Sequence, residues 1–477
     1  MNLPRIIQGG MGVAVSDWNL ARTVSQLGQM GVVSGTGVDT VLVRRLQDGD
    51  PCGSVREALA AFPIQEIAQK ILDRYFVPGG KPADKPYISK PLHAIDPGTP
   101  ILDLTVVGNF CEVWLAKRGH QGVVGVNLLT KIQLPTLPSL FGAMLAGVDY
   151  VLMGAGIPRA IPGALDKLSK LEVTNLRIDV EGADSGEVYE NVFDPSRYLP
   201  KGLSELIRPK FLAIVSSASL ALNLAKKASG KVDGFIIEGW TAGGHNAPPR
   251  GAMTLSEKGE PIYGPRDEAD LAAFRELGVP FWLAGSWGQP GKLEEALSEG
   301  AAGIQVGTAF AFCNESGINR DLKDRIIKAA QNKELEVFTD PLASPTGFPF
   351  KVVQLGESMS NDAVYEKRNR ICDLGYLRSA YKMEDGKIGY RCASEPIDDF
   401  VRKGGDLKET CGRKCVCNGL MSTVSIPQVR KDGYVEPVLV TAGDRLVDLE
   451  EFCPKGQERY SAEDVIRILT AKVPARV

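Results

Sequence analysis

Short apolar runs that lack alternation with polar residues recur along the first two thirds of the chain. They occupy residues 5–8, 31–34, 122–126, 149–153, 211–215, 234–238, 280–284 and 302–306. Such runs are typical of strands that are buried on both faces, as in parallel sheets. Helix-like stretches separate most of them, at residues 18–27, 139–146, 219–228, 267–277 and 293–299. Eight strand–helix repeats predict an α/β fold, a (β/α)8 TIM barrel, with a doubly wound open sheet as the structural alternative.

Two segments interrupt this repeat, and a third follows it. Residues from about 44 to 100 hold helix-like sequence at 55–62 and 64–74, and residues from about 172 to 200 contain two short stretches, 176–180 and 186–189, that suit a hairpin. Loops of a barrel accept such insertions. Past about residue 335 the alternation stops, although 462–472 is again helix-like. We therefore expect a barrel domain at 1–335 and a C-terminal cap or extension at 336–477.

Composition narrows the class of protein. The chain has 477 residues, of which 44% are hydrophobic and 24% charged, as in globular proteins with a sizeable core. The net charge of -3 gives no reason to expect nucleic acid or an anionic membrane as a partner. There is no run of about eighteen apolar residues, and the N-terminal run from Met1 to Ile7 lacks the pattern of a secretory signal. Nine cysteines, an odd number, fit reduced thiols, so we expect a cytoplasmic protein.

Two strand ends carry small residues that suit a phosphate. The seventh run ends at Gly285 and Ser286, and the eighth ends at Gly307 and Thr308. In a barrel the loops after strands seven and eight commonly hold a phosphate, and glycine lets backbone N–H groups approach its oxygens. Thr308 adds a hydroxyl group and is expected to begin a helix whose N-terminus favours an anion. Together the two turns predict a phosphate site, whereas either alone is more often a tight turn.

A third glycine cluster precedes a histidine. The chain has only three histidines, and His245 follows the sixth strand directly behind Gly243 and Gly244. A neutral imidazole accepts a proton near pH 7, and its charged form stabilises an anion. We therefore predict that His245 is catalytic, with a histidine on a surface loop as the alternative.

Four motifs on expected strand ends resemble those of a known family. They are Gln8-Gly9-Gly10-Met11-Gly12, Gly125-Val126-Asn127-Leu128, Thr241-Ala242-Gly243-Gly244-His245 and Gln305-Val306-Gly307-Thr308-Ala309-Phe310. In this order and spacing, over about residues 4 to 330, the chain resembles the nitronate monooxygenases. These were formerly called 2-nitropropane dioxygenases and are related to the FMN-dependent enoyl-acyl-carrier-protein reductases.

The resemblance implies an FMN cofactor and a redox activity. It implies that His245 orients an anionic nitronate beside the flavin, with dioxygen as the second substrate and a carbonyl compound and nitrite as products. A small-molecule substrate is thus expected, and a homo-oligomer is compatible with the sequence. The residues that the resemblance assigns to FMN are Gly9, Gly10, Met11, Asn127, Glu238, Gly243, Gly244, Gly285, Ser286, Gly307 and Thr308.

Two departures from the family pattern leave the substrate open. Ser286, followed by the bulky Trp287, stands where the family usually has glycine, and Glu238 stands where many nitronate monooxygenases have glutamine. Glutamate at that place is also found on the enoyl-reductase side. The alternatives are therefore an NAD(P)H-dependent flavin enoyl-thioester reductase and, from another class, a non-catalytic flavin-barrel binding protein.

Six of the nine cysteines lie in the C-terminal segment. They are Cys372, Cys392, Cys411, Cys415, Cys417 and Cys453. Four thiolates suit zinc or an iron–sulfur cluster, but the spacing C-x3-C-x-C differs from the common C-x2-C arrangement. We expect reduced or partly buried thiols and no metal, with a metal site as the alternative.

Overall fold

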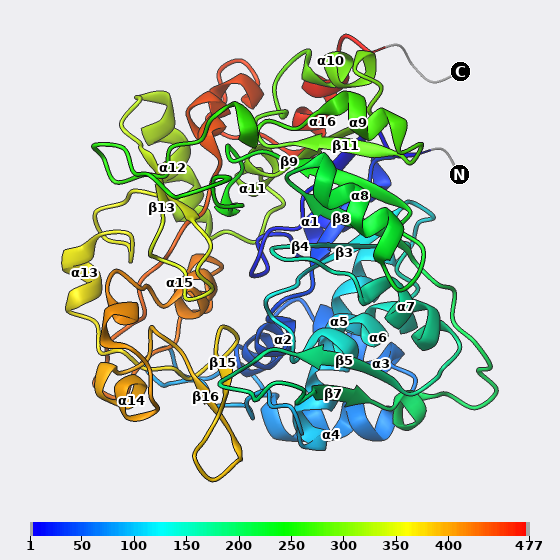
Figure 1. Cartoon of the computed structure of the whole chain (residues 1–477), viewed down its shortest axis with the longest axis vertical. Coiled ribbons are helices and arrows are strands. Elements are labelled where there is room, and N and C mark those ends of the chain that lie inside the picture. Colours follow the sequence, from blue (N-terminus) through cyan, green and yellow to red (C-terminus); the bar gives the residue numbers. More distant parts are fainter. Residues whose placement is uncertain (1–2, 474–477) are drawn as a thin grey trace.

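The computed structural model describes residues 3–473, and its centre is a barrel of eight parallel strands (Figure 1). In sheet order the strands are β1 (Ile6–Gln8), β12 (Gly303–Val306), β11 (Phe281–Ala284), β9 (Gly234–Glu238), β8 (Lys210–Val215), β4 (Tyr150–Gly154), β3 (Val124–Leu129) and β2 (Gly31–Ser34). The first and last strands of this order meet through a parallel bridge between Ile7 and Met30. The predicted (β/α)8 barrel, with all eight expected strands, is confirmed.

Side chains fill the inside of the barrel. A separate apolar cluster there includes Ile7, Val32, Leu152 and Trp282, each fully buried. The indole Nε1 of Trp282 donates a hydrogen bond to the backbone oxygen of Pro4 at 2.9 Å, so its polar atom is paired as well. The inside of the barrel is a packed core rather than a channel. A ligand can therefore bind only at the ends of the strands.

Helices cover the outside of the barrel. They are α1 (Trp18–Gln26), α2 (Val38–Gln47), α5 (Thr99–Lys117), α6 (Thr136–Leu145), α7 (Ile161–Ser169), α8 (Ala218–Lys227), α9 (Leu271–Glu276), α10 (Lys292–Ser298), α11 (Thr308–Ala311) and α12 (Arg320–Gln331). Local sequence sets several of their starts: the Asp17 carboxylate accepts hydrogen bonds from the first turn of α1. The helix expected from residue 267 begins later, because a short 3-10 turn at Pro265–Asp267 precedes α9.

Both predicted insertions are present. The first contains α3 (Ser54–Ala61) and α4 (Gln65–Tyr75), close to the expected helices. The second forms the expected antiparallel hairpin, of β5 (Thr174–Ile178) and β7 (Tyr189–Phe193), whose second strand begins at Tyr189 rather than at residue 186. A two-residue strand between them, β6 (Val180–Glu181), pairs with the C-terminal segment.

The C-terminal segment lies beside the barrel and then returns to it. Figure 1 shows its yellow and orange parts along one side of the molecule. Its last helix packs against α1 and α10. Its elements are β13 (Val337–Asp340), β14 (Phe350–Val353), α13 (Asp362–Glu366), β15 (Ser379–Lys382), β16 (Ile388–Arg391), α14 (Ile397–Arg402), the 3-10 helix η3 (Leu407–Thr410), α15 (Val416–Thr423), the 3-10 helix η4 (Asp444–Phe452) and α16 (Ala462–Thr470).

One short strand joins the two parts of the chain. This is β10 (Gly244–His245), which belongs to the loop after β9 and pairs in antiparallel fashion with β14. The C-terminal segment thereby fixes the backbone of the residue predicted to be catalytic.

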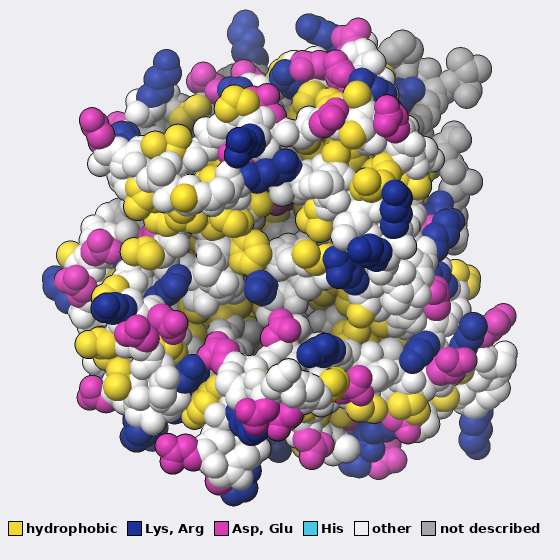
Figure 2. All heavy atoms as spheres, viewed as in Figure 1, with side chains coloured by type: hydrophobic (Ala, Val, Ile, Leu, Met, Phe, Trp, Pro, Cys, Tyr) yellow, Lys and Arg dark blue, Asp and Glu magenta, His cyan; other side chains and the backbone are white. Residues whose placement is uncertain are grey.

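The surface carries charges of both signs. Figure 2 shows one face, which is hollowed near its centre, with hydrophobic side chains along the hollow and cationic and anionic side chains interspersed around it. None of the helices in residues 3–473 combines the length and the apolar character that crossing a bilayer requires. Met1 and Asn2, the start of the N-terminal run considered above, and residues 474–477 lie outside the described range.

Candidate functional site

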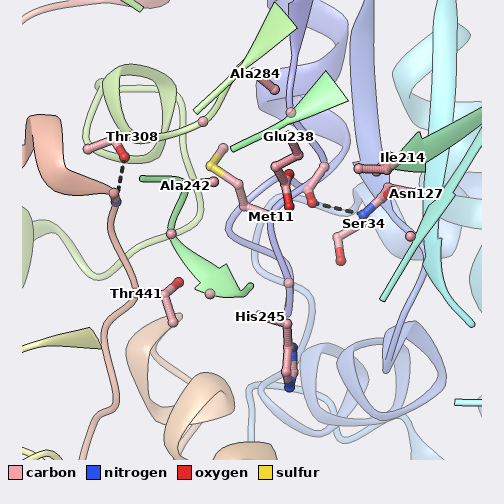
Figure 3. A pocket seen from close by; sticks show the side chains of 18 of the residues that line it. Met11, Ser34, Asn127, Ile214, Glu238, Ala242, His245, Ala284, Thr308 and Thr441 are labelled. Carbon is pink, nitrogen blue, oxygen red and sulfur yellow. Dashed lines mark hydrogen bonds between the residues drawn. The ribbon is translucent and has the colours of Figure 1, made fainter. Parts of the chain in front are cut away.

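A cavity of about 230 Å³ opens at the rim formed by the carboxyl ends of the barrel strands. Figure 3 shows side chains from several strand ends and from the C-terminal segment around it. All the residues predicted from the motifs line this one cavity: Gly9, Gly10, Met11, Asn127, Glu238, Gly243, Gly244, His245, Gly285, Ser286, Gly307 and Thr308. They converge because parallel strands end on the same side of a barrel.

Close packing explains two of the glycines. A Cβ atom on Gly10 would lie 2.3 Å from Cβ of Asn127, and one on Gly243 would lie 2.6 Å from the backbone carbon of Ala442. Gly285 has a φ of +80°, and Ser286, with a φ of 60°, follows it in the left-handed region. That conformation costs an ordinary residue roughly 1–2 kcal/mol, so the serine that departs from the family pattern occupies a position where glycine is the unstrained choice.

Two buried acceptors in the cavity wall have no hydrogen-bond partner among residues 3–473. The Asn127 side chain donates from Nδ2 to the Gly10 backbone oxygen at 3.1 Å, but its Oδ1 atom accepts no hydrogen bond. The Oε1 atom of Gln305 is also buried and unpaired. An unsatisfied buried polar atom costs about 1–3 kcal/mol, so both atoms suit a ligand that presents N–H donors to this wall.

His245 is held from the side of the C-terminal segment. Its Nε2 atom lies 2.7 Å from the Ser344 hydroxyl oxygen, and its ring packs against Phe350 with the centroids 4.6 Å apart. In Figure 3 the ring extends away from Met11 and Glu238. Burial lowers the pKa of His245 to about 4, so the imidazole is neutral at pH 7. Its Nδ1 atom has no hydrogen-bond partner among the described residues.

Glu238 ends strand β9 and faces the same cavity. Its carboxyl group has no hydrogen-bond or ion-pair partner among residues 3–473, and burial raises its pKa to about 7. A carboxyl group in this setting is protonated in a large fraction of molecules near neutral pH. It can therefore donate a hydrogen bond or exchange a proton inside the cavity.

The structure changes one expectation at the predicted phosphate end. Thr308 does begin a helix, but α11 has only four residues, so its N-terminus contributes little to anion binding. Instead, the Thr308 hydroxyl oxygen accepts a hydrogen bond from the Gly443 backbone N–H at 2.9 Å. The next residue, Asp444, donates its N–H to the Thr241 backbone oxygen at 3.0 Å. The C-terminal segment thus reaches the glycine turns, where Arg445 brings a cationic side chain to the cavity.

Sequence reasoning missed the wall that the C-terminal segment supplies. The residues from this segment that line the cavity are Phe350, Tyr376, Leu377, Val416, Cys417, Leu420, Thr441, Gly443, Arg445 and Phe452. They are scattered over about a hundred positions, and no motif or periodicity marks them as a group. The pairing of β10 with β14 and the contacts of Gly443 and Asp444 bring them to the rim.

Part of the chain matches a known family and known proteins. Residues 201–343 match the model of the family described as nitronate monooxygenase. A probable nitronate monooxygenase of Bacillus subtilis is 37% identical over 98 residues, which cover 20% of this chain and 26% of that protein. The (3aS,4S,5R,7aS)-5-hydroxy-7a-methyl-1-oxo-octahydro-1H-indene-4-carboxyl-CoA dehydrogenase of Mycobacterium tuberculosis is 27% identical over 116 residues, or 24% of this chain and 29% of that one. The chain thus matches less than a third of the length of either relative.

Solved structures show a weaker likeness over nearly the whole chain. FabK from Thermotoga maritima superposes with a TM-score of 0.46 and 15% identity, covering 98% of this chain and 92% of that one. A nitroalkane oxidase from Streptomyces ansochromogenes gives a TM-score of 0.46 and 15% identity, covering 98% and 95%. The identification of the fold as a barrel therefore rests on the strand order described above and not on these superpositions.

Proposed function

With residues 201–343 belonging to the nitronate monooxygenase family, we propose that this chain is an FMN-dependent oxidoreductase. Its substrate is an alkyl nitronate or a similar small carbon acid, and dioxygen is the second substrate. The observation that carries this proposal is the convergence of the family's motif residues on one cavity that also holds unpaired buried acceptors.

The cavity fits a flavin ring at one end. Gly9 and Gly10 offer a backbone surface without Cβ groups next to Met11, against which a flat ring can lie. The free Oδ1 of Asn127 and Oε1 of Gln305 are suited to accept hydrogen bonds from N–H groups at the ring edge. Loading with FMN would thereby remove two unsatisfied polar atoms from the wall.

The other end fits a phosphate. The turns at Gly243–Gly244, Gly285–Ser286 and Gly307–Thr308 bring backbone to this end of the cavity, and backbone N–H groups in such turns suit phosphate oxygens. Arg445 supplies a positive charge there, although it also forms an ion pair with Asp448 at 3.2 Å. We assign these residues to the phosphate of FMN.

FMN, when bound, supplies the redox chemistry, since it accepts electrons from the substrate. The chain supplies a neutral imidazole and a cavity at the strand ends. For Nδ1 of His245 to act as a base, the proton of the neutral ring must be on Nε2. Nε2 then donates a hydrogen bond to the Ser344 hydroxyl oxygen. Ser344 can then donate to the Thr346 hydroxyl, 2.8 Å away. In this tautomer Nδ1 of His245 accepts the α-proton of a neutral nitroalkane, and the resulting imidazolium stabilises the nitronate anion.

Glu238 favours the second candidate, an NAD(P)H-dependent flavin enoyl-thioester reductase. Its carboxyl group is protonated in a large fraction of molecules at neutral pH. A proton donor in the cavity suits a reduction, in which a substrate carbon gains a proton, more directly than an oxidation.

The deciding experiment compares two electron donors. Purified protein reconstituted with FMN is mixed anaerobically with propionate 3-nitronate and, separately, with NADH, and the flavin absorbance is followed. We expect rapid bleaching by the nitronate. Rapid bleaching by NADH without a response to the nitronate would establish the reductase instead. Protein that binds no FMN at all would support a non-catalytic barrel.

A further inference from the structure

The cavity wall on the side of His245 that faces the C-terminal segment is apolar. The imidazole ring packs against Phe350, with the centroids 4.6 Å apart. Leu377 and Leu420 pack against the same hydrophobic cluster that contains Phe350, and these residues all line the cavity at the strand ends. A substrate whose reacting carbon lies at His245 therefore has hydrocarbon side chains next to it.

Helix α15 supplies part of this wall. Val416, Cys417 and Leu420 line the cavity, and spacings of three and four residues place them on one face of the helix. Cys417 and Leu420 are only half-buried, whereas Asn418 and Met421, the residues that follow them, are buried. The helix thus leaves two apolar side chains partly uncovered at the cavity.

Cys417 is one of the six cysteines of the C-terminal segment. It is a free thiol, and within residues 3–473 no group of three or more His, Cys, Asp or Glu side chains is placed to hold a metal ion. A free cysteine packs as a small hydrophobic residue. Cys417 and Leu420 both pack against the hydrophobic cluster that contains Ile132, so we count Cys417 as part of the apolar wall.

The end of strand β3 and the loop after it supply the barrel side of the pocket. Leu129 and Ile132 line the cavity there. Leu129, Leu377 and Leu420 are partly buried side chains that pack against one cluster, in which Ile132 is fully enclosed at 6% exposure. Residues of the barrel and of the C-terminal segment therefore form one apolar pocket, which we call the leucine pocket (Leu129, Ile132, Leu377 and Leu420).

Tyr376 also lines the cavity at this place, but its hydroxyl group is already bonded. The hydroxyl donates to Asp39 at 2.5 Å and lies 2.6 Å from the hydroxyl oxygen of Thr40. A polar substrate group in the leucine pocket would therefore give up its hydrogen bonds to water without a new partner in Tyr376. A hydrocarbon chain would instead gain free energy by leaving water.

We propose that the C-terminal segment makes this enzyme selective for substrates with an apolar chain of several carbons, and that Leu377 and Leu420 hold this chain. The inference rests on the proposed function, because it takes His245 as the place of the reacting carbon. The chain then lies along Phe350 and α15 in the leucine pocket. The preferred substrate is thus a carbon acid with a longer alkyl chain rather than one of the size of nitroethane.

A second cavity offers a competing place for the remote part of a substrate. Tyr376 and Leu377 also line a polar cavity of about 340 Å³, where Lys131 and Arg378 contribute positive charge and Asp179 contributes negative charge. A substrate with a charged group at the far end of its chain would favour this polar cavity over the leucine pocket. The two possibilities predict opposite effects of a terminal charge.

The binding test uses alkanoates, because a carboxylate, like a nitronate, is a planar anion with two oxygens and does not react. The full chain reconstituted with FMN is titrated with butanoate, hexanoate and octanoate in a calorimeter. Each methylene group buried in the leucine pocket should tighten binding by roughly fourfold. Suberate, which carries a second carboxylate at the far end of the same chain, should bind more weakly than octanoate.

Variants of Leu420 identify the residue that contacts the chain. Leu420→Trp fills the pocket and should weaken octanoate binding by about tenfold or more, and butanoate binding by less. Leu420→Ala adds no bulk and should also reduce the ratio of the two affinities, because the chain loses a contact. Leu407→Trp is the matched control from the same segment, since Leu407 is 57% exposed, and it should keep the ratio of the parent protein.

Equal affinities along the series, or tighter binding of suberate than of octanoate, would overturn the proposal. FMN affinity is measured by flavin fluorescence for each variant. If Leu420→Ala weakens FMN binding as much as octanoate binding, Leu420 holds the cofactor and the proposal is also wrong. Binding that depends on chain length without turnover of any nitronate would refute the proposed function and leave the leucine pocket in place, so the two failures are distinguishable.

Discussion

The Nε2 atom of His245 lies 2.7 Å from the hydroxyl oxygen of Ser344, and these two residues come from different parts of the chain. His245 belongs to the loop after the sixth barrel strand, whereas Ser344 belongs to the C-terminal segment. Arg413 fixes the Ser344 loop in turn, since its guanidinium donates to the Ser344 backbone oxygen at 2.6 Å. The C-terminal segment therefore orients the one histidine that lines the cavity.

Replacing Ser344 with alanine is expected to reduce turnover while FMN binding is retained. The hydroxyl selects the tautomer of His245, and the loss of one such hydrogen bond costs about 1 kcal/mol, or roughly fivefold in rate. The measurement is kcat/KM with a nitronate across pH, because a change of tautomer also moves the pH profile. Ser344→Thr keeps the hydroxyl and should restore most of the activity. Equal profiles for Ser344→Ala and the parent protein would show that Ser344 has only a structural role.

Replacing His245 itself should have a much larger effect. A positioned acid or base contributes about 100- to 10,000-fold to a rate, so His245→Ala should lower kcat with a neutral nitroalkane by that order. The FMN affinity, measured by flavin fluorescence, should change little because the glycine turns remain. A preformed nitronate should be affected less, since it needs no proton transfer. Undiminished turnover of the nitroalkane would remove the catalytic role of His245.

The barrel and the glycine-bearing half of the site follow from local sequence, whereas the other half does not. Unalternating apolar runs identify the strands, and a closed parallel sheet places Gly10, Asn127 and His245 on one rim. Ser344 and Arg445 depend on tertiary packing instead, because they reach the cavity through contacts across some hundred residues. Thr308 shows the same limit: its place at a strand end and at the start of a helix was predictable, but the four-residue length of that helix and the hydrogen bond from the Gly443 backbone were not.

Because of Glu238, the free energy of unfolding of the FMN-free protein should decrease as pH rises. Its pKa is about 7 in the folded protein against an ordinary value of 4.5, so the folded state binds more protons between these values. The stability that Glu238 contributes is thus fully present below about pH 4.5 and is lost as pH rises through 7. Glu238→Gln should be more stable than the parent protein at pH 8, by up to roughly 3 kcal/mol.

Urea unfolding at pH 5 and pH 8 checks this prediction, and the advantage of Glu238→Gln should shrink at pH 5. Glu294 is the control, because it is exposed and has no partner among the described residues. Glu294→Gln should show no such dependence on pH. An equal effect of both substitutions would mean that Glu238 titrates normally.

Arg445 should contribute to FMN affinity through charge. A hydrogen bond to a charged group is worth about 1.5–3 kcal/mol, so Arg445→Ala should weaken FMN binding by at least about tenfold. The effect should be smaller for riboflavin, which lacks the phosphate, and it should diminish in high salt. Lys455→Ala, which removes an exposed cation of the same segment, is the control. If FMN and riboflavin lose affinity equally, Arg445 does not act on the phosphate.

Replacing Gly243 with alanine tests whether the C-terminal backbone has to lie against the glycine turns. A methyl group on Gly243 would stand 2.6 Å from the backbone carbon of Ala442, so Gly243→Ala must displace the stretch that bonds to Thr308 and Thr241. We expect FMN affinity to fall and proteolysis within residues 441–445 to accelerate, because this stretch loses its anchor. Gly239→Ala is the matched control from the same loop, since its added carbon would meet nothing closer than 3.9 Å. If the two variants behave alike, the contact between the C-terminal segment and the turns is dispensable, and the barrel alone must form the phosphate end of the site.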